Sequence, residues 1–135
     1  MKWYTKAALD GNEWAQNKLA NCYYYGDGVE QDEAKAVEYF TKSAEAGNKN
    51  SMNRLGDCYN YGRGVEQDYQ QAINWYQQAA EQNIEGAMNK LGECYQYGYG
   101  VEQDYQQAIN WYQKAAEKGN GWAQDMLGSF YEYGK

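Results

Sequence analysis

Three observations on the sequence predict an all-α fold, a right-handed α-solenoid of stacked antiparallel helical hairpins. The chain of 135 residues repeats itself every 36 residues from end to end, without an insertion. Each period contains two stretches in which apolar residues recur with the spacing of one helix face. Short Gly-containing segments separate these stretches, as expected for turns between helices. Because one hairpin cannot bury its own apolar face, such units stack on one another.

The repeat is visible at single positions. Leucine recurs every 36 residues at Leu19, Leu55, Leu91 and Leu127. A large aromatic residue recurs at Trp3, Tyr39, Trp75 and Trp111, and a Tyr-Gly pair begins at Tyr25, Tyr61, Tyr97 and Tyr133. The segments Gly64–Gln77 and Gly100–Gln113 are identical over 14 residues. This regularity predicts that the units share one local structure.

Each unit is predicted to contain two helices. The stripe of the first helix is formed in the first full unit by Ala15, Leu19, Cys22 and Tyr23, and that of the second by Ala36, Phe40, Ser43 and Ala44. A glycine interrupts the first helix at Gly56, Gly92 and Gly128, which predicts close approach of a neighbouring helix. The expected helices are 2–10, 13–25, 33–46, 49–61, 69–82, 85–97, 105–118 and 121–133.

The turns agree with this assignment. In the segment Tyr25–Asp32, YGDGVEQD, Gly26 and Gly28 suit positive φ angles after a helix. Asp32 suits the N-cap of the following helix, as do Asp68 and Asp104 in the next units. We therefore expect a single repeat domain over residues 1–135. Its parts are a partial unit with only the second helix (1–12), three full repeats (13–48, 49–84 and 85–120) and a partial unit with only the first helix (121–135).

These motifs resemble the Sel1-like repeat family, a 36-residue relative of the tetratricopeptide repeat. The resemblance rests on the Leu-Gly pair, the Tyr-Gly-x-Gly-Val loop, the capping Asp and the Trp/Tyr-Tyr-x-x-Ala-Ala ending, and it covers essentially the whole chain. Two departures are Ala20 in place of the helical Gly and Asn83 in place of a turn Gly. The resemblance implies an adaptor or scaffold protein.

Composition limits the possible partners. The formal net charge is −7, which disfavours nucleic acid and anionic membranes as partners. No stretch is long and apolar enough to span a bilayer, and no charged-then-apolar leader opens the chain. We therefore expect a soluble protein, and its compartment is not assigned. Reduced cysteines would be compatible with the cytoplasm.

No motif predicts catalysis, a cofactor or a metal site. The chain has no His, and Cys22, Cys58 and Cys94 occupy one equivalent position in successive units. Equivalent positions of stacked hairpins are too far apart for disulfides, so we predict reduced thiols in the core. The carboxylates Glu30 and Asp32 recur in the later units, which fits capping and solvation better than acid–base catalysis.

The side of the first helices opposite the apolar stripe is the predicted binding site. With Ala15 at 0° and about 100° per residue, Asn17, Asn21 and Tyr24 point away from the stripe, with Trp14 beside them. In the related tetratricopeptide fold this side lines the concave groove. The predicted peptide-binding residues are Trp14, Asn17, Asn21, Tyr24, Asn50, Asn53, Asp57, Asn60, Asn89, Glu93, Gln96, Trp122, Asp125, Ser129 and Glu132. Because this set contains no Lys or Arg, we expect it to favour basic or polar segments, with Asn17, Asn53 and Asn89 as a carboxamide ladder for an extended backbone.

We interpret the chain as a scaffold or adaptor that binds proteins or peptides, and not as an enzyme. One alternative is an engineered or excised repeat module with no natural ligand, which the near-identical units also suit. The other is a carboxylate-dependent enzyme, which no local motif supports. The incomplete terminal units also predict possible end-to-end self-association.

Overall fold

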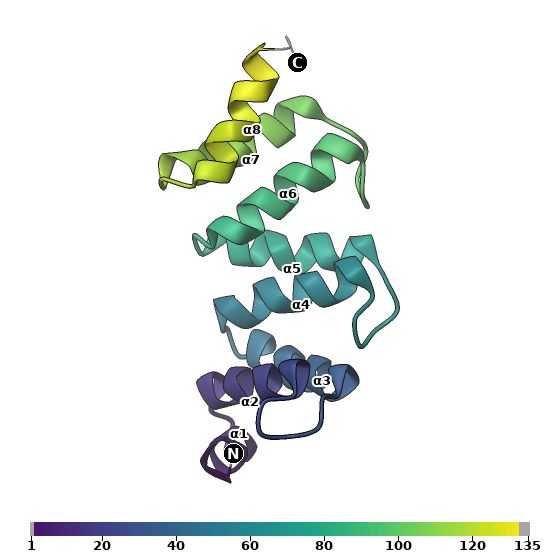
Figure 1. Cartoon of the computed structure of the whole chain (residues 1–135), viewed down its shortest axis with the longest axis vertical. Coiled ribbons are helices and arrows are strands. Elements are labelled where there is room, and N and C mark those ends of the chain that lie inside the picture. The colour runs from purple at the N-terminus through teal and green to yellow at the C-terminus, as the bar shows by residue number, and fades with distance from the viewer. Residues whose placement is uncertain (1, 133–135) are drawn as a thin grey trace. The chain divides into compact units, whose positions relative to one another are not determined.

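A computed structural model describes residues 2–132, with the side chains of residues 5–130, and this part of the chain is helical without a strand (Figure 1). The helices are α1 (Lys2–Leu9), α2 (Glu13–Tyr25), α3 (Glu33–Glu45), α4 (Lys49–Tyr61), α5 (Tyr69–Glu81), α6 (Glu85–Tyr97), α7 (Tyr105–Glu117) and α8 (Gly121–Glu132). The predicted all-α repeat fold is confirmed. Each second helix ends one residue earlier than expected, for example at Glu45, because Ala46 is its C-cap and Gly47 leaves the helix with a φ of 102°.

The chain forms two compact units that divide within α5, between Trp75 and Tyr76. In the first unit α2 packs against α1 and α3, and α3 packs against α4. In the second unit α7 packs against α6 and α8. Consecutive helices therefore form hairpins in both units, as the 36-residue period predicts.

Asparagine and aspartate side chains begin most of the helices. Asn12 Oδ1 accepts the Ala15 N–H at 2.8 Å, and Asn48 and Asn120 make the equivalent bonds at the starts of α4 and α8. The predicted N-caps Asp32, Asp68 and Asp104 also accept backbone N–H groups, at 3.0 to 3.2 Å. Among the starts of α2 to α8, the exception is Ile84 before α6, which has no side-chain cap bond. These caps satisfy N–H groups that have no partner inside the helix.

The loop after each first helix is held by a glycine and a glutamine. Gly26, Gly62 and Gly98 are left-handed, with φ angles of 70°, 67° and 73°. In the first such loop, Gln31 Nε2 donates to the Tyr24 carbonyl at 2.8 Å. Gln67 and Gln103 make the same contact in the next two loops, each at 2.7 Å. The glutamine of the VEQD motif therefore satisfies a carbonyl that the helix leaves without a partner.

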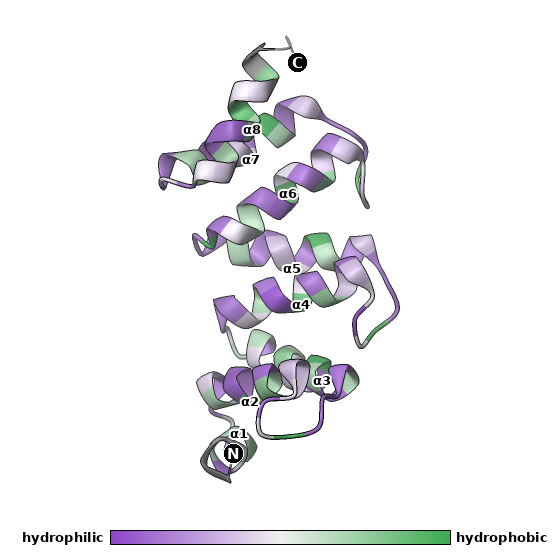
Figure 2. Ribbon diagram, viewed as in Figure 1, coloured by the Kyte–Doolittle hydropathy of each residue, from purple (hydrophilic) through white to green (hydrophobic). Residues whose placement is uncertain are grey.

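The predicted apolar stripes are mostly buried, although Cys22 and Tyr23 of α2 are half-buried. Leu19, Leu55 and Leu91 are at most 1% exposed, and Phe40 and Tyr112 are fully buried. Figure 2 shows apolar and polar residues alternating along the helices, as expected when only one side of a helix is covered. The assignment of the core side of each first helix is therefore correct.

Candidate protein-interaction surface

The first helices of the repeats leave one side uncovered. Residues at helical spacings of four, three and four are exposed or half-buried in α2, α4 and α6. We call this set the open face: Trp14, Lys18, Asn21 and Tyr25 in α2; Asn50, Arg54, Asp57 and Tyr61 in α4; Gly86, Lys90, Glu93 and Tyr97 in α6; and Trp122, Met126 and Ser129 in α8. These positions cover a sector of about 60° on each helix.

The structure separates the predicted binding residues into three groups. Exposed on the surface are Trp14, Asn50, Trp122, Asp125 and Ser129. Half-buried are Asn21, Asn53, Asp57, Asn89, Glu93 and Gln96. Buried are Asn17, Tyr24 and Asn60, at 7% to 8% exposure. The expectation that the last three side chains point to solvent is wrong, and the side chain of Glu132 lies outside the described residues.

A chain of hydrogen bonds explains why Asn17 is buried. Asn17 Nδ2 donates to Ser51 Oγ at 2.7 Å, Ser51 Oγ donates to Ser43 Oγ at 2.8 Å, and Ser43 Oγ donates to the Glu13 carbonyl at 2.6 Å. These bonds join α2, α3 and α4 inside the first unit. Buried polar groups need such partners. The sequence places Asn17 among polar residues, and no local signal shows that another helix covers it.

The predicted carboxamide ladder is only partly on the surface. Asn17 is part of the packing just described. Asn89 Nδ2 donates to the N-cap oxygen of Asn120 at 3.1 Å, which ties α6 to the start of α8. The Oδ1 atoms of Asn53 and Asn89 are buried and have no hydrogen-bond partner among the described residues. The ladder is therefore wrong at Asn17, and a role in backbone recognition at Asn53 and Asn89 stays a prediction.

The open face carries cations that the predicted set lacked. Lys18, Arg54 and Lys90 occupy one equivalent position in α2, α4 and α6. The predicted binding set contains no Lys or Arg, so the open face differs from that set at this position. The first helices are covered on the flank that holds Asn17 and Tyr24, so the open face is rotated away from that flank and includes the cation position. Its charges are mixed, as the ion pair between Lys90 Nζ and Glu93 Oε2 at 3.9 Å shows.

The first unit contains a cluster of tyrosines and arginines, which we call the Tyr–Arg cluster: Tyr24, Tyr25, Arg54, Tyr61 and Arg63. The rings of Tyr24 and Tyr25 are 4.9 Å apart at their centroids and meet edge to face. Arg54 Cζ lies 5.5 Å from the Tyr25 centroid and 6.0 Å from that of Tyr24. Arg63 Nη1 donates to Tyr24 Oη at 2.7 Å, and its Cζ lies 5.3 Å from the Tyr61 centroid. This cluster was not predicted from the sequence, although Arg54 and Arg63 are the only arginines in the chain.

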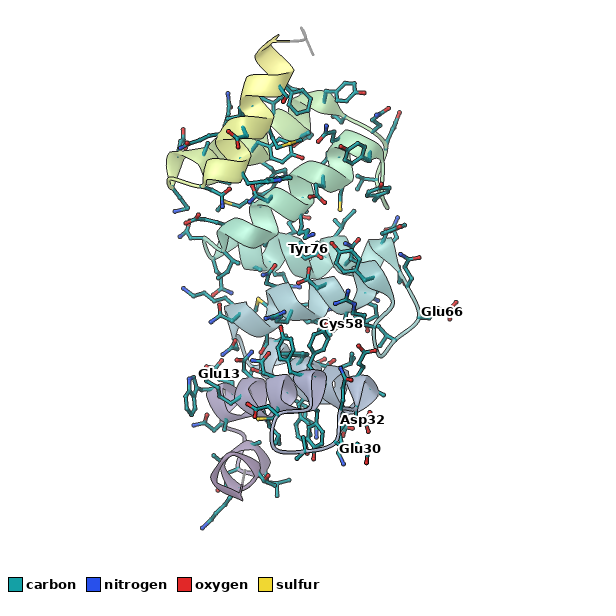
Figure 3. The ribbon with its side chains drawn as sticks, in the orientation of Figure 1. Glu13, Glu30, Asp32, Cys58, Glu66 and Tyr76 are labelled. Carbon is teal, nitrogen blue, oxygen red and sulfur yellow. The ribbon has the colours of Figure 1, made fainter. Side chains whose placement is uncertain are left out.

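The cysteines and the loop carboxylates lie in different surroundings. Burial, with help from neighbouring carboxylates, raises the pKa of Cys58 and Cys94 to about 12, so both thiols are protonated and unreactive at neutral pH. Figure 3 shows Cys58 in the first unit, and Glu30, Asp32 and Glu66 on the loops after α2 and α4, where they are exposed. No three His, Cys, Asp or Glu side chains come together as a metal site within the described residues.

The predicted disulfide-free state is confirmed, since Cys22, Cys58 and Cys94 are free. Their burial differs, however. Cys58 and Cys94 are buried as expected, whereas Cys22 is half-buried. Cys22 lines a shallow depression of about 550 Å³ with Lys18, Asn21, Tyr25 and Asp27. Assignment of Cys22 to the core is therefore only partly correct.

The hairpins and their loops match a known repeat family. The family description "Sel1 repeat" fits residues 1–12, 15–48, 49–84, 86–120 and 123–135, which is nearly the whole chain. The chain belongs to the Sel1 repeat family. The resemblance stated from the sequence is thereby confirmed.

Solved Sel1-like structures share the fold. The protective antigen c5321 of uropathogenic Escherichia coli, which has an SLR fold, is 39% identical with a TM-score of 0.97 over 99% of this chain. A Sel1 repeat protein from Oxalobacter formigenes is 36% identical with a TM-score of 0.92 over 99% of the chain. The chain spans 29% and 55% of these two proteins' lengths. Cysteine-rich protein B of Helicobacter pylori is 26% identical with a TM-score of 0.71, over 93% of this chain and 90% of that one. Comparison with curated protein sequences yields no match.

Sel1 repeat proteins generally serve as scaffolds for protein interactions and are typically not enzymes. For this Sel1 repeat chain, the described helices include none that is both long and apolar enough to cross a bilayer.

Proposed function

We propose that this chain is a protein-interaction scaffold that binds extended segments of partner proteins on the open face. The observation that supports the proposal is the exposure of large aromatic side chains there. Tyr25 and Tyr61 in the first unit are 57% and 47% exposed, and Tyr97 in the second unit is 55% exposed. Tyr and Trp are enriched at protein interfaces because they bury a large area with few rotatable bonds.

The two tryptophans of the open face support the same proposal. Trp14 in α2 is 45% exposed and Trp122 in α8 is 42% exposed, at equivalent positions of their repeats. An aromatic residue thus lies at the start of the open face in α2 and α8, and at its end in α2, α4 and α6. Within each unit, the open face carries polar and charged side chains of both signs besides these aromatic residues. Such a surface suits a polar segment with apolar side chains at intervals.

The preference for polar, extended segments remains part of the proposal. The preference for basic segments was based on a surface without Lys or Arg. Since Lys18, Arg54 and Lys90 lie on the open face, that basis is removed. End-to-end self-association also stays a prediction, for which sedimentation equilibrium over a range of protein concentrations is the direct measurement.

The proposal is tested by selecting peptides from a displayed library on the intact chain. We expect binders whose affinity falls about tenfold or more when Tyr25→Ser and Tyr61→Ser are combined, because central aromatic residues dominate interface energies. Tyr105→Ser is the matched control, since Tyr105 is 44% exposed but lies at the start of α7, a second helix. Selection of no peptide, as the alternative of a module without a ligand predicts, or equal losses in all variants, would overturn the proposal.

A further inference from the structure

We propose that the first unit binds a partner segment through one carboxylate side chain, an Asp or Glu, held by Arg54 on the open face and by Arg63 on the loop after α4. This inference rests on the proposed function and specifies its partner. The ligand is recognised by two guanidinium groups and by the rings of Tyr25 and Tyr61. Guanidinium and carboxylate groups fit each other through paired N–H···O bonds.

Tyr24 brings the two arginines together. Its hydroxyl accepts a hydrogen bond from Arg63 Nη1 at 2.7 Å, while Arg54 Cζ lies 6.0 Å from the centroid of the same ring. The ring itself is only 7% exposed, so it is a fixed part of the packing. Both guanidinium groups are therefore located around one buried side chain, although they come from different parts of the second repeat.

The loop after α4 fixes the approach of Arg63. The next residue, Gly64, has a φ of 77°, and a Cβ there would lie 2.3 Å from the Glu33 carbonyl oxygen. This close contact places the loop directly against the start of α3. The Arg63 N–H also donates to the Cys58 carbonyl at 2.9 Å. Arg63 is thus positioned before a ligand arrives, which lowers the entropy cost of binding.

The two guanidinium groups have donors to spare. Arg63 makes one side-chain hydrogen bond, and each guanidinium carries five N–H donors. Among the described side chains, neither arginine lies within 4.0 Å of a carboxylate, whereas Lys42 and Lys90 each do. Both arginines also lie near tyrosine rings, at 5.5 Å for Arg54 and 5.3 Å for Arg63. Contact with a ring uses the guanidinium plane and leaves its N–H edges for an acceptor.

The repeat register shows why the site belongs to the first unit. The open-face position that holds Asp57 in α4 and Glu93 in α6 holds the uncharged Asn21 in α2. The position of Arg63 holds Asp27 in the first loop and Tyr99 in the third. The combination of two arginines with an uncharged residue in the neighbouring helix therefore occurs once in the repeats.

The surroundings favour a single carboxylate over an acidic run. The net charge of the chain is −7, and Glu33 is close enough to contribute to the raised pKa of Arg63, after the larger effect of the Tyr24 hydrogen bond. In a run of acidic residues, the carboxylates that lie beyond the cluster would be repelled by the negative charges of the chain. At physiological salt, charges more than about 8 Å apart are largely screened, so one carboxylate at the arginines is not penalised in the same way.

The test uses a library of acetylated and amidated peptides, so that only side chains carry carboxylates. We expect binders of the wild-type chain to share an Asp or Glu at one position. Replacing it by Asn or Gln should weaken binding about tenfold or more, as should Arg54→Gln with Arg63→Gln. The matched control is Lys42→Gln with Lys114→Gln, which removes the same charge from exposed positions on the second helices α3 and α7 and should change affinity by less than about twofold. The peptide substitutions test the inference even if an arginine variant folds poorly.

The outcomes separate the two proposals. Binders without a shared Asp or Glu, or with equal affinity for the Gln peptide, would overturn the carboxylate site and leave the scaffold proposal intact. Equal losses in the arginine and lysine double variants would show that overall charge acts instead of the cluster, and would also overturn the site. Recovery of no peptide at all would overturn both proposals.

Discussion

The ring of Tyr112 lies directly against Gly92, so that a Cβ on Gly92 would come within 2.4 Å of Tyr112 Cε1. Tyr112 is fully buried, and its hydroxyl donates to Gln96 Oε1 at 2.7 Å. In the first repeat the equivalent residues are Ala20 and Phe40, both fully buried. The helical glycine predicted to mark a close approach therefore makes room for one ring of the partner helix in the same hairpin.

Gly92→Ala is expected to destabilise the chain by about 1–3 kcal/mol, because an added methyl group in a packed core forces its neighbours to move. Urea unfolding measures the change. Gly128→Ala is the matched control, since Gly128 occupies the equivalent position in α8 and a Cβ there meets nothing within 4 Å. That control should gain up to about 1 kcal/mol from helix propensity. Equal effects of the two substitutions would contradict the contact.

Ile84→Asn is expected to give a chain about 1 kcal/mol more stable than Ile84→Ala does, because asparagine can cap α6 and alanine cannot. Ile84 is the N-cap of α6 and makes no side-chain cap bond, whereas Asn48 and Asn120 cap α4 and α8. Comparing Asn with Ala removes the loss of the half-buried isoleucine from the difference. Thermal unfolding of both variants is the measurement, and identical midpoints would show that this helix start does not accept a cap.

Ser51→Ala is expected to cost about 1–3 kcal/mol, because it leaves the buried amide of Asn17 and the hydroxyl of Ser43 with fewer partners. The hydroxyl of Ser51 joins the two at 2.7 and 2.8 Å. Ser43→Ala should lower the free energy of unfolding less in the Ser51→Ala chain than in the wild-type chain, since the later repeats carry alanine at both positions. A double-mutant cycle in urea should give a coupling energy of at least about 0.5 kcal/mol. Strict additivity would show that the hydroxyls act independently.

Cys22 is expected to react with a thiol reagent such as Ellman's reagent well before Cys58 and Cys94. It is half-buried, whereas the other two are at most 2% exposed and have raised pKa values. Only exposed thiolates react readily. At pH 8 we expect one fast equivalent and two that appear only on unfolding. Cys22→Ser should abolish the fast phase, and three equal phases would contradict the burial of the other two.

Stability is expected to fall as the pH rises from about 9 towards 12. Burial, followed by Asp57 for Cys58 and Glu93 for Cys94, raises both pKa values to about 12, above the value near 8.5 of an unfolded thiol. In this window the folded state keeps protons that the unfolded state has lost, so the contribution present at lower pH disappears. Burial also raises the pKa of Tyr112, which changes stability with pH in the same direction. The fall should be less steep in a Cys58→Ala, Cys94→Ala variant, and parallel curves would contradict this assignment.

Local sequence signals predicted the helices and their caps closely. The caps at Asp32, Asp68 and Asp104 and the left-handed turn at Gly26 depend on residues close together in the chain, so they can be read without a structure. Asn83, which replaces a turn glycine, adopts a φ of 69°, as this residue type tolerates. The burial of Leu55 and Leu91 also follows from the spacing of apolar residues alone.

The candidate surface was predicted less well. The helical wheel placed Asn17 and Tyr24 opposite the apolar stripe, yet both are buried because a second flank of α2 meets α4 and its loop through Ser51 and Arg63. The contacts on this flank are hydrogen bonds between polar residues. Such residues leave no pattern of apolar spacing from which their burial could be predicted. For the same reason the predicted binding set omitted the cations Lys18, Arg54 and Lys90, which lie on the open face.

By itself, the sequence determined the repeat, the helices, the caps and the side of each helix that enters the core, because helix periodicity and capping act between residues a few positions apart. The tertiary structure decided which polar residues are covered and which are left to meet a partner. That choice depends on contacts such as Asn17 with Ser51 and Tyr24 with Arg63, whose members are 34 and 39 residues apart. Only when the hairpins pack does the Tyr–Arg cluster come together.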